Sequence, residues 1–81
     1  MGFVSRLEIE DKTITILATI LKCEVDRGTS RQNTSQWDSL KHIEIVFALE
    51  EELGVEFSEK QMAALSSVSA IADEVLASSA A

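Results

Sequence analysis

Hydrophobic residues recur at helical spacing over most of the chain. In residues 5–23 they lie three, four or seven positions apart, as on one face of an amphipathic helix, and they are Leu7, Ile14, Leu17, Ala18 and Leu21. The pattern predicts two further principal helices, over residues 39–53 and 67–77, and a short helix over residues 58–64. The fold class that follows is all-α, a small four-helix bundle with three principal helices and one short helix.

Capping residues mark the ends of these helices. Asp38 is the predicted N-cap of the second principal helix, and Gly54 is the predicted left-handed residue that ends it. Two Ser-x-x-Glu/Gln sequences predict capping boxes at the starts of the first helix and of the short helix: Ser5 with Glu8, and Ser58 with Gln61. We expect Ser66 or Ser67 to cap the last helix.

One segment of the first helix allows another interpretation. Thr13 to Ile16 alternates like a strand and is β-branched, so the helix could instead begin at Asp11. No partner strand is visible elsewhere in the sequence, and helix is therefore the prediction.

The apolar faces of the helices define one core, and we expect residues 1–81 to form a single domain. Predicted core residues are Leu17, Leu21, Val46, Leu49, Leu53, Leu65, Val68, Ile71 and Val75. Residues 26–36 carry no apolar side chain and predict a long loop. Residues 77–81 have nothing to pack against, so we expect this tail to fray.

The second principal helix has two apolar stripes where a surface helix needs one. The first is an ordinary core stripe that includes His42, and it contains Ile45, Val46, Leu49 and Leu53. The second stripe contains Leu40, Ile43 and Phe47. Both stripes could be core if the helix lies deep in the bundle, and Ile43 fits either interpretation. For Leu40 and Phe47 we expect partial exposure as a docking patch.

The charge is concentrated on and beside the same helix. The chain has 81 residues, of which 46% are hydrophobic and 26% charged, and its net charge is −7. Residues 38–59 hold seven acids against Lys41 alone, a net charge of −6. This balance argues against nucleic-acid binding and favours docking on basic partner proteins.

Few residues could perform chemistry. One cysteine, Cys23, excludes an internal disulfide and is interpreted as a small core hydrophobe, and a zinc site is not expected from one Cys and one His. His42 is predicted to point into the core stripe, where it cannot serve as the base of a catalytic triad. The N-terminus lacks a secretory signal and no apolar run is long enough to span a membrane, so we expect a cytoplasmic protein.

Residues 37–55 read WDSLKHIEIVFALEEELGV and resemble the acyl carrier protein family. The Asp-Ser-Leu triplet at residues 38–40, opening an acidic second helix, is similar to that family's attachment motif. Residues 67–71, SVSAI, also resemble the family's last helix. The resemblance covers residues 37–76 well and the first helix only by its length and position.

The resemblance implies that Ser39 carries a 4′-phosphopantetheine arm, on whose thiol acyl groups are held as thioesters. The protein would then be a non-catalytic carrier, expected as a monomer. Its implied partners are a phosphopantetheinyl transferase, an acyl-loading ligase or synthase, and downstream acyl-transfer enzymes. The expected docking residues beside the arm are Asp38, Leu40, Glu44, Phe47, Glu51 and Glu56.

Several positions depart from the pattern of fatty-acid carriers. Gln36 and Trp37 stand where those carriers have Leu-Gly, Lys41 replaces an acid, and the loop before Asp38 is short. These departures favour a specialised lipid or secondary-metabolite pathway. Trp37 is interpreted as an apolar lid folded back on the bundle, or as a contact with the arm or a partner.

Two alternatives to an acyl carrier remain open. An aminoacyl, D-alanyl or peptidyl carrier would use the same arm, whereas a helical adaptor would bind proteins without ever being modified. For an acyl carrier we expect an apolar space between the second helix and the later helices, with walls that include Ile45, Val46, Leu49 and Ile71.

Overall fold

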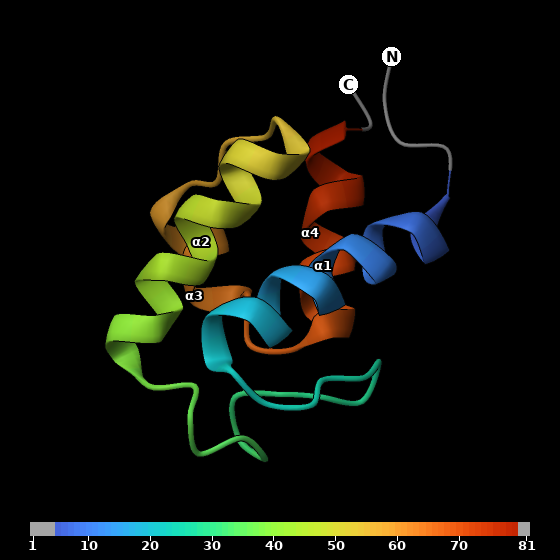
Figure 1. The fold of residues 1–81 in the computed structure, drawn as a ribbon. Helices are drawn as coiled ribbons and strands as arrows, with labels where there is room; N and C mark the ends of the chain where they lie inside the picture. Colours follow the sequence, from blue (N-terminus) through green and yellow to red (C-terminus); the bar gives the residue numbers. More distant parts are fainter. Residues whose placement is uncertain (1–4, 80–81) are drawn as a thin grey trace.

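The computed structural model describes residues 5–79, and these contain four helices: α1 (Arg6–Leu21), α2 (Ser39–Leu53), α3 (Glu59–Ala64) and α4 (Val68–Ser79). Figure 1 shows α1 crossing α4, with α2 and the short α3 on the other side of the bundle. The all-α prediction is confirmed, and α2 has the predicted bounds. No helix in the described part of the chain is long and apolar enough to cross a membrane.

The first helix buries Leu17 and Leu21 as predicted, but the rest of its buried stripe differs from the prediction. Its buried residues are Ile9, Thr13, Leu17 and Leu21, four residues apart, whereas Leu7 is 58% exposed. Thr13 can be buried because its hydroxyl donates to the backbone oxygen of Ile9 at 2.8 Å. Because α1 begins at Arg6, the alternative start at residue 11 is wrong, and residues 13–16 are helical rather than a strand.

The helix ends follow the capping chemistry with small differences. The Oγ of Ser5 accepts from the N–H of Glu8 at 3.2 Å, which is one of the two bonds of the predicted capping box. The helix ends at Leu21, two residues before the predicted end, because Lys22 adopts the left-handed conformation at φ 56°. Ser58 and Gln61 form both bonds of their capping box.

The last helix starts one residue later than predicted and extends further. Ser67 rather than Ser66 caps it, since the Ser67 hydroxyl accepts from the N–H of Ala70 at 3.0 Å. The helix continues beyond residue 77 to Ser79, so the first part of the tail expected to fray is helical. Residues 80–81 of that predicted tail lie outside the described residues.

All nine predicted core residues are buried, in a cluster that joins α1, α2, α4 and the segments between them. The cluster also contains Ile9, Trp37, Ile45, Phe57 and Ala72. Cys23 packs partly buried against it, as its interpretation as a core hydrophobe required. At one end of the bundle, the guanidinium of Arg6 ties α1 to α4 through hydrogen bonds to Asp73 and Ser69.

The loop between α1 and α2 is held by backbone hydrogen bonds. Ser30 and Ser67 form an isolated antiparallel bridge. The N–H of Arg31 donates to the Ser66 oxygen at 2.8 Å, and the N–H of Val68 donates to the Thr29 oxygen at 3.1 Å. Figure 1 shows this loop running beneath α1 and beside the connection from α3 to α4. The middle of the loop is therefore fixed to the start of α4.

Candidate functional site

Ser39 is the first residue of α2 and is exposed to solvent. The preceding Asp38 performs the capping, because its Oδ1 accepts from the N–H of Lys41 at 2.9 Å. The Ser39 hydroxyl is therefore not needed to begin the helix. It remains available for modification at a helix end whose free N–H groups and dipole favour a phosphate.

A loop arginine lies directly beside this hydroxyl. The Nη2 of Arg31 donates to the Oγ of Ser39 at 3.2 Å. Sequence reasoning missed this contact, because Arg31 lies in a polar loop eight residues before Ser39 and only the folded loop brings the two together. An arginine beside the candidate serine adds a positive charge to an otherwise acidic part of the chain.

Trp37 is nearly fully buried, with 2% of its surface exposed, so the interpretation of this residue as a lid on the bundle is confirmed. Its indole Nε1–H donates to the Nδ1 of His42 at 3.0 Å. The Nε2 of His42 lies 2.8 Å from the backbone oxygen of Met62, near the end of α3. Both ring nitrogens of His42 are thus engaged, and neither is available to act as a base toward Ser39.

The second apolar stripe of α2 faces solvent. Leu40, Ile43 and Phe47 are 73%, 52% and 62% exposed. The interpretation of this stripe as a second core face is therefore wrong, including for Ile43, and the exposure expected for Leu40 and Phe47 is confirmed. Large apolar side chains gathered on one surface are typical of a contact site.

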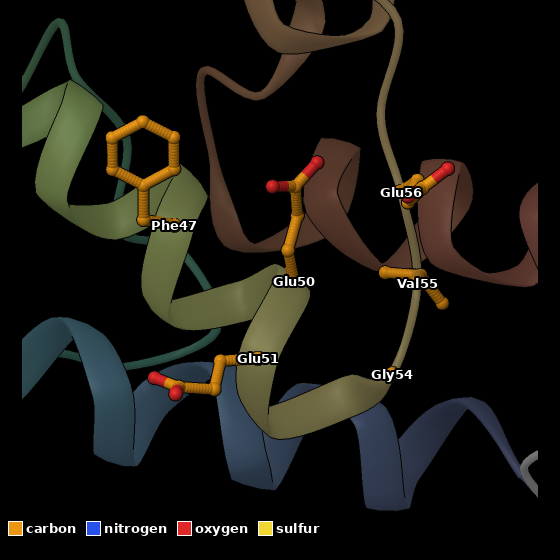
Figure 2. A pocket seen from close by; sticks show the side chains of 6 residues that line it. All are labelled: Phe47, Glu50, Glu51, Gly54, Val55 and Glu56. Atoms are coloured by element: carbon orange, nitrogen blue, oxygen red, sulfur yellow. The ribbon is translucent and has the colours of Figure 1, made fainter.

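The predicted acidic docking residues do not all lie together. Glu44 is exposed and lies 3.9 Å from the Nζ of Lys41, a weak surface ion pair. An open concavity of about 550 Å³ lies beside the end of α2. Its lining residues are drawn in Figure 2, and they are Phe47, Glu50, Glu51, Gly54, Val55 and Glu56. In that view Glu51 projects from one side of α2, and Glu56 lies on the following segment, on the other side.

Glu50 has an internal role that the sequence did not reveal. Its carboxylate accepts from the backbone N–H of Phe57 at 2.8 Å, which turns the chain back after Gly54. A carboxylate that satisfies a backbone donor is part of the fold, so the acidic run at residues 50–52 is only partly a surface for partners.

An apolar groove opens between α2 and α3, and one of its lining residues is Arg31, which contacts Ser39. Its volume is about 440 Å³, within the range of small-ligand sites, and it is lined by Arg31, His42, Ile43, Val46, Phe47, Met62 and Ala63. Of the four predicted wall residues only Val46 lines it. Ile45, Leu49 and Ile71 are fully buried in the core instead. The space lies at the exposed edge of the helix pair rather than at the centre of the bundle.

A family model described as a phosphopantetheine attachment site matches residues 11–75. The chain belongs to this family of carriers. No curated protein matches the chain. The membership agrees with the resemblance to acyl carrier proteins and identifies 4′-phosphopantetheine as the prosthetic group of the domain. Domains of this kind are in general non-catalytic and interact with transferases and synthases.

The residues around Ser39 fit such a group. An exposed hydroxyl at a helix start is open to a modifying enzyme, and the guanidinium of Arg31 matches the negative charge of a phosphodiester. The same Arg31 lines the apolar groove. These three features lie together on one side of the bundle.

Proposed function

We propose that Ser39 is the attachment residue and that the chain carries acyl intermediates for lipid or secondary-metabolite biosynthesis. The observation that carries the proposal is the placement of Ser39, exposed at the start of α2, within the residues that match the family. When attached, the prosthetic group supplies a terminal thiol on which an acyl chain is held as a thioester. The protein itself presents the group and is not an enzyme.

The residues around Ser39 fix the start of α2 so that the serine is presented in one orientation. Asp38 caps the helix, and Trp37 is buried immediately before it. His42 links the Trp37 indole to the Met62 carbonyl, which ties α3 to the same end of α2. A transferase therefore meets a preformed surface rather than a flexible loop.

The groove favours an acyl cargo over an aminoacyl or peptidyl one. Five of its seven lining residues are apolar, and these are Ile43, Val46, Phe47, Met62 and Ala63. The two polar members already have hydrogen-bond partners: Arg31 bonds to Ser39, and His42 bonds to Trp37 and Met62. A hydrocarbon chain would gain from burial there, whereas an ammonium group would lose its hydration without acquiring a partner.

Partner enzymes are proposed to dock on the exposed face of α2. Leu40, Glu44, Phe47 and Glu51 follow one another at steps of four, three and four residues and therefore share this face. Asp38 lies at its start, and Glu56 lies just beyond the end of α2. The acids would attract a basic transferase, ligase or acyl-transfer enzyme, and the apolar pair would supply contact area.

Intact-mass measurement tests the function directly. The protein is incubated with coenzyme A, Mg²⁺ and a phosphopantetheinyl transferase, and we expect the mass of one phosphopantetheine to be added. Ser39→Ala should abolish the addition. Ser35→Ala is the matched control, because this nearby exposed serine contacts only Gln36 through its hydroxyl. An unmodified wild-type chain under every transferase would overturn the proposal and favour a protein-binding adaptor.

A further inference from the structure

The three arginines of the chain have different partners. Arg6 and Arg27 form ion pairs with carboxylates on α1 and α4, and their partners are Glu10, Asp11 and Asp73. Hydrogen bonds raise the pKa of both guanidinium groups above the usual arginine value. The largest contribution comes from Asp73 for Arg6 and from Glu10 for Arg27. Arg31 forms no ion pair with any carboxylate among residues 5–79, and its guanidinium donates to the Ser39 hydroxyl.

A neutral hydroxyl is a poor match for a guanidinium. Arginine presents several N–H donors in a planar fork, and its strongest partners are carboxylates and phosphates that accept two bonds at once. A single serine oxygen satisfies one of these donors. A phosphodiester on that same oxygen would bring to the guanidinium two further oxygens that share one negative charge.

We infer that Arg31 binds the phosphodiester of the prosthetic group and thereby anchors the first part of the arm. The inference rests on the proposed function, in that it requires Ser39 to be the modified residue. It assigns Arg31 a positioning role in the modified carrier. The ligand group is a phosphodiester monoanion, recognised by charge and by the donor fork.

The backbone of Arg31 is held independently of this side-chain contact. Its N–H donates to the Ser66 oxygen at 2.8 Å, and the neighbouring Ser30 pairs with Ser67. The guanidinium is therefore placed beside Ser39 before any modification occurs. Such preorganisation reduces the entropy that is lost when an ion pair forms.

Arg31 also lines the apolar groove between α2 and α3. A phosphate held by this side chain starts the arm at the edge of the groove. Binding of the phosphate at Arg31 therefore selects among conformations of the arm. It favours those that run along Ile43 and Phe47 over those that extend into solvent. The pair is solvent-accessible, and we expect added salt to weaken it.

Nuclear magnetic resonance of the whole chain in its unmodified and modified forms tests the inference. Modification should shift the Arg31 Nε–Hε resonance while those of Arg6 and Arg27 stay in place, since both already bind carboxylates. The ³¹P resonance of the modified protein should differ between wild type and Arg31→Gln. The difference should shrink as salt is raised. Arg31→Lys, which keeps the charge but not the fork, should lie between the two.

Two controls separate this inference from the proposed function. Arg27→Gln removes an arginine that binds Glu10 and Asp11 and should leave the ³¹P resonance unchanged. Intact mass and circular dichroism establish that each variant is modified and folded. A ³¹P resonance identical in modified wild type and Arg31→Gln, with an unmoved Arg31 Nε–Hε, would overturn the anchor while the carrier function stands. Failure of the wild type to gain mass would overturn both.

Discussion

The indole of Trp37 donates its one N–H to the Nδ1 of His42 at 3.0 Å, with the two rings stacked 6.1 Å apart. Because an indole nitrogen is only a donor, Nδ1 must accept, and the neutral ring then carries its hydrogen on Nε2. Nε2 in turn donates to the Met62 oxygen at 2.8 Å. One imidazole thus joins the segment before Ser39 to the end of α3.

This chain of hydrogen bonds should contribute to stability. We expect Trp37→Phe to lower the free energy of unfolding by more than about 1 kcal/mol, since it removes a donor from His42 and leaves a small cavity. Urea unfolding followed by circular dichroism measures the change. A double-mutant cycle with His42→Phe isolates the pair, and a coupling energy of zero would contradict a shared hydrogen bond. The Nε2–H tautomer is checked by ¹⁵N chemical shifts of the ring.

Substitutions at the two residues with left-handed backbone conformation, Gly54 and Lys22, should change stability in opposite directions. Gly54 has φ 66°, and a Cβ built there would meet no atom within 4 Å, so Gly54→Ala should cost about 1 kcal/mol from backbone strain alone. Lys22 has φ 56° with a side chain that strains the same conformation. Lys22→Gly should therefore stabilise the protein by roughly 0.5 kcal/mol. Urea midpoints that move in the same direction would refute this explanation.

The link between α1 and α4 through Arg6 should depend on salt and not on ordinary changes of alkaline pH. The pKa of Arg6 is raised above the usual arginine value, chiefly by its hydrogen bond to Asp73. The contribution of Arg6 to stability is therefore complete below the unfolded pKa and is lost only as pH rises through the still higher folded pKa. Arg6→Ala should lower Tm, by less at high salt, and the deficit should stay constant from about pH 7 to 10. Lys60→Ala, at an exposed lysine, is the control. A deficit that changes over this pH range would count against the assignment.

The docking face predicts two different salt responses. Glu44→Lys with Glu51→Lys should lower transferase kcat/KM roughly tenfold at low salt, and the loss should shrink as salt screens the exposed charges. Phe47→Ala should also lower kcat/KM roughly tenfold, with little salt dependence, because apolar contact area is lost. Glu52→Lys is a matched control, since Glu52 faces the α1 side near Lys12. Equal salt responses for the Glu and Phe variants would refute the assignment of electrostatic attraction to the acids and of apolar contact to Phe47.

The sequence predicted helices and caps better than it predicted which side chains meet. Asp38 and Gly54 determine the ends of α2 through local chemistry, so its bounds follow from the sequence. In α1 the sequence predicted Leu17 and Leu21 as buried, but it missed Thr13, because a threonine counts as polar until its hydroxyl bonds the turn before it. Long-range partners were also missed. The contacts from His42 to Met62 and from Glu50 to Phe57 join a side chain to a distant backbone atom, and no periodicity records them.

In the candidate site, too, the sequence predicts local features but not long-range contacts. Ser39 and the exposed stripe around Leu40 and Phe47 can be found from the motif and from the faces of a helix. Arg31 cannot, because its place beside Ser39 depends on backbone hydrogen bonds between two loops. Loop contacts of this kind are decided by tertiary structure rather than by local preference.

The bridge between Ser30 and Ser67 also has a topological consequence. The chain leaves this point, forms α2 and α3, and returns to the same point before α4 begins. Residues 31–66 are thus an excursion whose two ends already meet, while α1 and α4 pack on each other outside it. Such a segment can be exchanged as a cassette: a foreign α2–α3 unit needs to match one pair of adjoining ends and the apolar face that α2 packs against α1, and chimaeric carriers with new enzyme preferences could be built on this frame.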